Sequence, residues 1–347
     1  MLTISVILAI KNGEEYIKYL DHQFDKIELL YKEKYEFEYF ILENNSTDKT
    51  KDYIRQFFFN RCRKGNFFME DLNNNLNFSK EINKTRGEYM AFLRNKLKKC
   101  HGTLNSDYTL LIDCDIIFSS NIIEKMINIF NEYVYYVGPS DKNIKKVILP
   151  TNPNIVFSKP INSQKKDWND KFQLNVDHGN NILNIKRIDS EEGWGQQLEL
   201  LVKPLASIAA VSVFDSCISN SASTNDHYYD SLAMITNKNI SYLNNNNTCM
   251  FLNCDRCINV RKHLNICLND NLLLPRNNVF DVNSAFGGFF LLKTEIYNNV
   301  QWEGSICEHH SFCKNIKKFG NILIEPRLKI YHVEYGKYME YHQKLFG

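Results

Sequence analysis

Two aspartates separated by one residue, Asp113-Cys114-Asp115, have the spacing in this chain that most clearly suggests chemistry. They follow directly on residues 108–112, a short apolar run that predicts a buried strand. Two carboxylates with no neighbouring base suit a hard divalent cation, and Mg²⁺ or Mn²⁺ is commonly held by carboxylates together with substrate phosphates. The alternative is a solvated acidic pair at the end of a strand. The pattern predicts a cation site, with Mn²⁺ or Mg²⁺ as the cofactor.

The turn after the first predicted strand lacks the glycine-rich motifs that bind phosphate. Residues 10–14 read Ile-Lys-Asn-Gly-Glu, which is neither a G-x-G-x-x-G turn nor a P-loop. A nucleotide at this turn would therefore lack a glycine-rich cradle for its phosphates. A cation held by the two aspartates would neutralise them instead.

The elements that must position these residues alternate in hydrophobic period over the first 135 residues. Strands are expected at 3–10, 37–42, 66–69 and 108–112, and helices at 17–30, 49–58, 86–99 and 122–130. Strands that alternate with helices imply right-handed β-α-β units. We therefore expect an α/β fold with a mostly parallel sheet and helices on both faces.

The pattern loosens in the middle of the chain and returns near its end. A strand is expected at 282–292, a helix at 310–319 that ends at Gly320, and two short strands at 322–324 and 328–332. This division predicts a first half-domain at 1–135, a large insertion at 136–280 and a C-terminal part of the same domain at 281–347.

Composition excludes some classes of protein. The 347 residues include 42 Lys and Arg against 40 Asp and Glu, so the formal net charge is only +2. A nucleic-acid binder that works through a clustered basic excess is therefore not expected. No stretch approaches the roughly 18 apolar residues of a membrane span, and the N-terminus lacks the features of a signal peptide. We expect a cytoplasmic protein, with peripheral membrane association and oligomeric state left open.

A cysteine-rich stretch offers a second metal-binding hypothesis. It contains Cys249, Cys254, Cys257, His263 and Cys267, and one pair has C-x2-C spacing. A structural zinc site is one interpretation. Because a second well-spaced ligand pair is missing, ordinary reduced thiols are the favoured interpretation.

Taken together, the motifs resemble those of the GT-A nucleotide-sugar glycosyltransferases. The opening strand with Asn12, the segment 41–50, the Arg94-Asn95 pair and the two aspartates are similar to the family-2-type enzymes. The C-terminal residues 307–313 also resemble fungal capsule-type mannosyltransferases, and the glycine pair 287–288 resembles a strand that borders the acceptor site. The resemblance covers about the first 130 and the last 65 residues.

The resemblance implies a donor site for a UDP- or GDP-linked sugar. Glu43 would contact the nucleotide base, Asp115 would be the direct metal ligand, and Asp113 and His332 would complete the metal site. The residues implied to bind the donor are Ile10, Asn12, Glu43, Asn45, Arg94, Asp113 and Cys114.

The resemblance also implies a catalytic and acceptor side. Glu308 would be the general base, since displacement at the anomeric carbon with inversion needs a carboxylate to take the proton of the acceptor hydroxyl. An acidic residue that faces a helix dipole is the alternative interpretation. The residues expected to contact a glycan or other hydroxyl acceptor are Gly287, Gly288, Asp230 and His309.

We therefore expect a divalent-metal-dependent glycosyltransferase, a hexosyl- or pentosyltransferase, acting on a hydroxyl acceptor. Three alternatives remain: a sugar nucleotidyltransferase, an inactive glycan-binding or scaffold module of the same fold, and a zinc-containing interaction protein. The first turn lacks the glycine-rich, arginine-containing signature of a nucleotidyltransferase.

Overall fold

The computed structural model describes residues 1–71, 84–130, 133–137, 145–149, 172–177, 182–187, 198–201, 208–217, 233–236, 239, 279–304, 307–332 and 336–346. The chain divides into two compact units, the first formed by Met1–Met126 with Ile208–Gly347 and the second by Ile127–Ser207. Strand β11 (Ile208–Cys217), which lies inside the expected insertion, belongs to the sheet of the first unit.

The described residues of the first unit contain a ten-stranded sheet in the order β12-β13-β15-β11-β14-β4-β1-β2-β3, with β5 paired to β15. Its N-terminal half is parallel and consists of β1 (Leu2–Ile10), β2 (Tyr35–Asn44), β3 (Lys64–Glu70) and β4 (Tyr108–Ile112). The C-terminal half is mixed, because β14 (Phe289–Lys293) is antiparallel to both β4 and β11, whereas β11 and β15 (Asn321–His332) are parallel.

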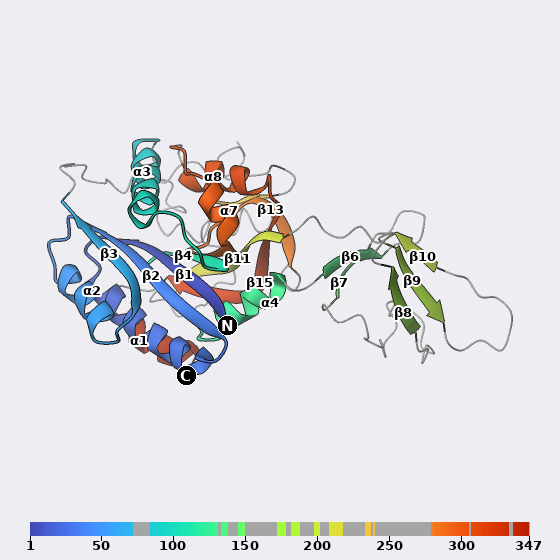
Figure 1. Cartoon of the computed structure of the whole chain (residues 1–347), viewed down its shortest axis with the longest axis horizontal. Coiled ribbons are helices and arrows are strands. Elements are labelled where there is room, and N and C mark those ends of the chain that lie inside the picture. The colour runs from blue at the N-terminus through green and yellow to red at the C-terminus, as the bar shows by residue number, and fades with distance from the viewer. Residues whose placement is uncertain are drawn as a thin grey trace, which may run out of the picture. The chain divides into compact units, whose positions relative to one another are not determined.

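Helices lie on both faces of this sheet. Figure 1 shows α1 (Glu14–Tyr31) and α2 (Thr50–Phe59) below the strands, and α3 (Lys84–His101), α7 (Thr294–Asn299) and α8 (Glu308–Ile316) above them. The apolar stripe of α1, which the spacing of Ile17, Leu20 and Phe24 predicts, is buried. The α/β prediction with helices on both faces is thus confirmed.

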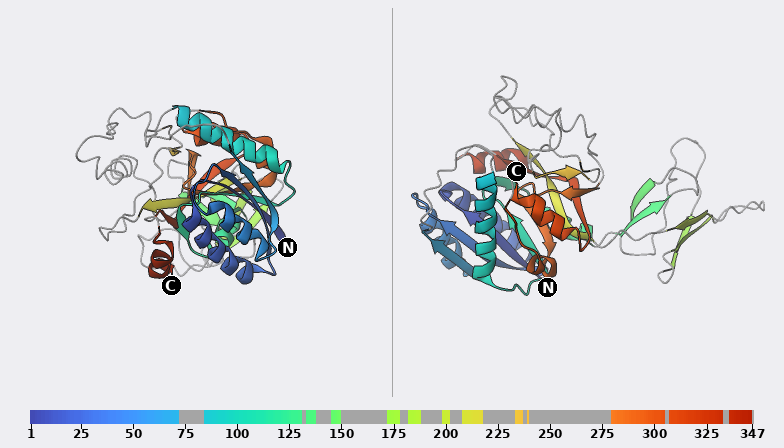
Figure 2. Two further views of the ribbon diagram at one scale, coloured as in Figure 1. Left: turned by 90° about the vertical axis from the view of Figure 1, so that its left-hand side faces the viewer. Right: turned by 90° about the horizontal axis from the view of Figure 1, so that it is seen from above.

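Two further helices contact α1. Helix α4 (Ile122–Phe130) is tied to α1 by the bond from the Tyr31 hydroxyl to Glu124. The C-terminal helix α9 (Tyr338–Phe346) packs against α1 and β5 (Ile116–Phe118) (Figure 2). In the described part of the chain, no helix combines the length and apolar character that crossing a membrane requires.

The described residues of the second unit are the end of α4 and five strands. One hairpin pairs β6 (Tyr133–Val137) with β7 (Lys145–Leu149), and a three-stranded antiparallel sheet contains β8 (Phe172–Asp177), β9 (Ile182–Arg187) and β10 (Leu198–Leu201).

The expected strand at 282–292 is wrong as a single element. The chain forms β13 (Phe280–Ser284), turns at Gly287 and Gly288, and then forms β14. Both glycines have positive φ, 59° and 68°, a conformation that other residues rarely adopt. Residues 284–292, which include the turn, are all buried, so the apolar character continues across the break between the two strands and hides it from a periodicity argument.

The two short strands expected at 322–324 and 328–332 form one strand, β15. Its register against β11 shifts between Val213 opposite Glu325 and Phe214 opposite Lys329, around Pro326. A proline has no N–H to donate to a ladder, so it is tolerated in a strand mainly at such an irregularity. The remaining β12 (Ile235–Thr236) pairs with β13 at the edge of the sheet.

Candidate active site

The residues with predicted chemistry converge at one edge of the sheet. Strand β1 is parallel to β2 on one side and to β4 on the other, with Ile10 opposite Glu43 and Leu8 opposite Ile112. The chain runs from β1 through β2 to β3 and then returns to the other side of β1 as β4. Strand order therefore reverses beside β1, and the crevice at the carboxyl ends of such strands is where open α/β sheets bind ligands.

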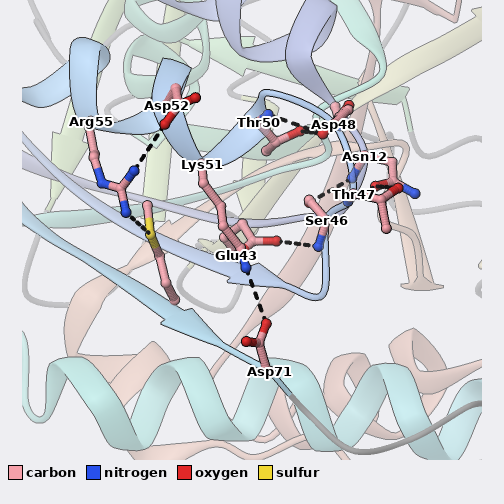
Figure 3. A network of polar contacts seen from close by, with 12 residues as sticks. Asn12, Glu43, Ser46, Thr47, Asp48, Thr50, Lys51, Asp52, Arg55 and Asp71 are labelled. Carbon is pink, nitrogen blue, oxygen red and sulfur yellow. Dashed lines mark hydrogen bonds and ion pairs between the residues drawn. The ribbon is translucent and has the colours of Figure 1, made fainter.

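The loops that follow β1 and β2 are locked together through Asn12 (Figure 3). The Asn12 backbone N–H donates to Ser46 Oγ at 2.8 Å, and Asn12 Oδ1 accepts from the Thr47 N–H at 2.8 Å. Asn12 and Asn45 both have positive φ, 49° and 54°. Asparagine adopts this conformation more readily than most residues, so both belong to the architecture of this edge.

Asp48 ties the start of α2 to the start of α1. Its carboxylate accepts from the Thr50 N–H at 3.0 Å and from the Glu14 N–H at 3.3 Å, while Thr50 Oγ1 accepts from the Gly13 N–H at 2.7 Å. Burial opposes ionisation of Asp48, but the bonds from Thr50 outweigh it and lower its pKa. Asp48, which precedes the N-cap residue Lys49 of α2, is therefore an anionic carboxylate.

Glu43 is fully buried directly below these loops. Its Oε1 accepts from the Ser46 N–H at 2.6 Å, and Lys51 Nζ lies 3.8 Å from its Oε2 and 3.1 Å from Asp71 Oδ1 (Figure 3). In this geometry Glu43 shapes the loop and orients Lys51, a residue that the sequence patterns did not single out. Its contact with a nucleotide base stays a prediction.

The acidic pair begins where β4 meets the glycine turn. The Asp113 N–H donates to the Gly288 carbonyl at 2.8 Å. A side chain at Gly288 would meet Ile116 and Ile330 at 3.3 Å and Asp113 Cβ at 3.7 Å, so the glycine permits close contact here. Ser212 Oγ on β11 donates to the Phe286 carbonyl at 2.9 Å, and this hydrogen bond fixes the residue that precedes the glycine turn.

Asp115 and His332 lie together although 217 positions apart in the chain. The distance between Asp115 Oδ2 and His332 Nδ1 is 3.4 Å, because β5 pairs antiparallel with β15 and places Ile116 opposite His332. Asp115 is 47% exposed and His332 15%. One oxygen and one nitrogen donor, with the carboxylate facing solvent, suit a cation that takes its other ligands from substrate and water.

Asp113 contacts a different partner. Its Oδ1 lies 3.4 Å from Arg94 Nη2. Among the described residues, no group of three His, Cys, Asp or Glu side chains is arranged to hold a metal ion. Burial raises the pKa of Asp113, and the Arg94 guanidinium opposes that shift. The metal role of Asp113 stays a prediction, whereas Asp115 and His332 are brought together.

Arg94 joins the two halves of the site. Its guanidinium on α3 contacts Asp113 through Nη2 and Glu308 Oε1 through Nε, each at 3.4 Å, and its side chain is 10% exposed. Its neighbour Asn95 fixes the loop before α8, because Asn95 Nδ2 donates to the Trp302 carbonyl at 2.7 Å and Oδ1 accepts from the Trp302 N–H at 3.1 Å. The Arg94-Asn95 pair therefore sets the distance between α3 and Glu308.

Glu308 begins α8 and is ionised despite its burial. Burial alone would raise the pKa of this carboxyl, but His309 and the Arg94 guanidinium together lower it below its usual value. His309 itself has its pKa lowered to about 3, chiefly by burial. The imidazole is thus neutral at pH 7, and Arg94 is the cation beside Glu308. A carboxylate held anionic in this way can accept a proton.

Of the remaining predicted residues, Cys114 is described by the structure and Asp230 is not. Burial, followed by the charges of Asp115 and Asp113, raises the pKa of the Cys114 thiol well above its usual value, so the thiol stays protonated. Asp230 and the cysteine-rich stretch lie outside the described residues. Phe286 belongs to the segment 285–289 that resembles a strand bordering the acceptor site, but its stacking on His309 was not expected.

No protein-family model and no curated protein matches the chain. Among solved structures, a crystal structure of S. aureus TarS is similar over 96% of this chain and 60% of that chain, at 11% identity and a TM-score of 0.42. A mannosyltransferase from Pyrobaculum calidifontis in complex with GDP-Man and Mn²⁺ is similar over 98% and 59%, at 10% identity and a TM-score of 0.41. The chain thus spans about three fifths of the length of these structures.

Proposed function

We propose that this protein is a divalent-metal-dependent glycosyltransferase that transfers a sugar from a nucleoside-diphosphate donor to a hydroxyl acceptor. One observation carries the proposal. The acidic pair stands at the point where strand order reverses beside β1, and Arg94 connects it to an ionised carboxylate on α8. Asp113 and Glu308 thus contact one guanidinium, and we assign the first to the donor side and the second to the acceptor side.

The roles follow from the chemistry of each group. Asp115 and His332 would hold Mn²⁺ or Mg²⁺, and the bound cation would supply positive charge for the departing diphosphate. Asn12 and its partners provide a rigid edge for the nucleoside. Glu308 would take the proton of the acceptor hydroxyl as its oxygen attacks the anomeric carbon.

Donor binding is tested by thermal stability. UDP, GDP and their sugar derivatives are screened with and without Mn²⁺, because a ligand that binds only the native state stabilises it by about 2.7 kcal/mol at one hundred times its Kd. We expect at least one nucleoside diphosphate to raise the melting temperature, and to do so only with Mn²⁺. If none does, the proposed donor class is wrong.

Asp115→Asn is expected to abolish the Mn²⁺-dependent shift and sugar transfer while leaving the fold intact. The matched control is Asp52→Asn, which removes an exposed carboxylate on α2 that pairs with Arg55. The control should behave as wild type. An Asp115→Asn protein that responds to Mn²⁺ and turns over like wild type would remove this residue from the metal site.

A further inference from the structure

Lys51, in the first turn of α2, is held between two carboxylates that differ in their exposure. Its Nζ lies 3.8 Å from Glu43 Oε2 and 3.1 Å from Asp71 Oδ1 (Figure 3). The Glu43 side chain is fully buried, whereas Lys51 is 31% exposed and Asp71 is 76% exposed. The ammonium therefore lies between a carboxylate that solvent cannot reach and one that it can.

Glu43 is placed to act on a ligand through Lys51. Its Oε1 accepts from the Ser46 N–H at 2.6 Å, while its buried Oε2 has no hydrogen-bond partner in the described part of the chain. A buried carboxylate is costly unless a charge compensates it, and the ammonium of Lys51 supplies that charge. The pair fixes the ammonium at the carboxyl end of β2, and Lys51 is its accessible member.

The ammonium is charged and has hydrogen-bond donors to spare. The hydrogen bond to Asp71, followed by the charge of Glu43, raises the pKa of Lys51, so the residue is a cation at neutral pH. An ammonium has three N–H groups and accepts no hydrogen bond. Among the residues that the structure describes, one N–H is donated to Asp71, and Glu43 lies too far away to accept another. A ligand at this position must therefore offer an acceptor.

The charges around the ammonium favour a neutral acceptor over a phosphate. Two carboxylates outnumber the single ammonium, so the cluster carries an excess of negative charge. Arg55, whose charge also reaches Lys51, is itself paired with Asp52 at 3.0 Å. Like charges brought together are unfavourable, so this cluster would repel a diphosphate. A carbonyl oxygen of a neutral ring meets no such penalty.

The place of Lys51 along the sheet matches a nucleobase. The Asp115–His332 pair, at which the cation and diphosphate are proposed to bind, lies beyond the end of β4, and the strand order is β4-β1-β2-β3. Two strand spacings place the end of β2 about 10 Å from the end of β4. This is about the distance from the phosphate to the base within a nucleotide. A diphosphate at the cation would therefore bring the base to Lys51.

We propose that Lys51 recognises the nucleobase by donating a hydrogen bond to a ring carbonyl oxygen, and that Glu43 is the positioning residue behind it. The inference rests on the proposed function. Uracil and guanine both carry such a carbonyl. The base takes an N–H of the ammonium from the exposed Asp71, while the buried Glu43 keeps Lys51 in place. Glu43 thus acts through Lys51 and not by the expected direct contact with the base.

Lys51→Met removes the ammonium and keeps an unbranched side chain. Isothermal titration calorimetry measures the Kd of UDP, of GDP and of inorganic pyrophosphate, each with Mn²⁺. We expect the nucleoside diphosphate that wild type binds to bind about 10-fold more weakly, the usual loss for a hydrogen bond to a charged group. Pyrophosphate binding should not change. The matched control is Lys34→Met, which removes an exposed lysine paired with Glu124 and should bind both ligands as wild type does.

A double-mutant cycle tests the role of Glu43. Glu43→Gln removes the charge that holds the ammonium, so it should weaken binding of the nucleoside diphosphate in the wild-type background. In the Lys51→Met background it should have no further effect, because residues that act through one another are not additive. Losses that add in full would show that Glu43 contacts the base itself. Melting temperatures without ligand report whether each variant folds, and Lys51→Met alone decides the assignment if Glu43→Gln does not.

Each outcome has one interpretation. Wild-type affinity in Lys51→Met would exclude Lys51 from donor binding and leave the proposed function standing. An equal loss for pyrophosphate would show that Lys51 contacts phosphate, which also overturns the inference. If wild type binds pyrophosphate with Mn²⁺ but no nucleoside diphosphate, the proposed donor class and the role of Lys51 fail together.

Discussion

At the scale of single residues, Arg94 determines the charge state of the site. It is nearly buried and contacts two carboxylates that come from distant parts of the chain. A buried charge is costly unless it is paired, so Asp113 and Glu308 compensate Arg94 as much as Arg94 compensates them. Although burial opposes ionisation, His309 and then Arg94 lower the pKa of Glu308, which keeps the proposed base ionised at neutral pH.

Glu308→Gln tests the base. The amide oxygen can still accept from Arg94, so the local structure and donor binding should persist. We expect kcat to fall by roughly 10²–10⁴-fold, the usual contribution of a general base. Steady-state kinetics measure this, with Glu303→Gln, an exposed acid on the preceding loop, as the control that should keep wild-type kcat. An unchanged kcat in Glu308→Gln would exclude it from proton transfer.

At the scale of elements, the edge strand β3 supports the strand that carries Glu43. Glu43 lies opposite Met69 in the β2–β3 ladder, and Tyr39 lies opposite Gly65. Gly65 has φ of 116°, and a Cβ there would lie 1.9 Å from the Tyr39 carbonyl oxygen. The close approach of these two strands therefore depends on a missing side chain.

Gly65→Ala should destabilise the protein by more than about 3 kcal/mol, because backbone strain of about 1–3 kcal/mol is added to a collision with backbone. Gly102→Ala is the matched control, since Gly102 has φ of 72° and nothing lies within 4 Å of the added Cβ. Gly102→Ala should lower the free energy of unfolding only by the backbone strain at this φ, about 1–2 kcal/mol. Urea unfolding measures both, and equal losses would contradict the role assigned to the Tyr39 contact.

At the scale of the whole molecule, three buried or half-buried histidines couple stability to pH. Burial is the main cause that lowers the pKa of His101 to about 4, of His309 to about 3 and of His342 to about 4. The ordinary value is 6.5, so between 6.5 and these values the unfolded chain binds protons that the folded chain does not. Stability should therefore be full above about pH 6.5 and fall as the pH decreases through this window.

A series of melting temperatures between pH 7.5 and 4.5 checks this coupling. We expect the melting temperature to fall steadily below about pH 6.5, and His342→Gln to show a shallower fall because glutamine does not titrate. His342 contacts the Tyr19 hydroxyl at 3.2 Å, and glutamine can keep a hydrogen bond there. A slope in His342→Gln equal to that of wild type would show that this histidine contributes nothing to the coupling.

Local patterns account for the parts of the fold that were predicted well. Helix α1 and the strands β1, β2 and β4 have strong apolar periodicity, and each is buried as that periodicity predicts. Among the elements that were missed, β5, α7 and α9 are short or depend on packing against distant strands, and β7 to β12 lie in the region 136–280, where no element was expected. The turn at Gly287-Gly288 was missed because burial on both sides of it removes the polar signal that usually marks a turn.

The sequence by itself determined the α/β class, the parallel N-terminal strands and the residue types of the site, because these depend on short-range periodicity and on side-chain chemistry. Only the tertiary structure decided which of those residues act together. Arg94 meets Glu308 across 214 positions, and Asp115 meets His332 through antiparallel pairing of β5 with β15. Such contacts are set by strand order in the mixed half of the sheet, which is a property of the packed chain and not of any local segment.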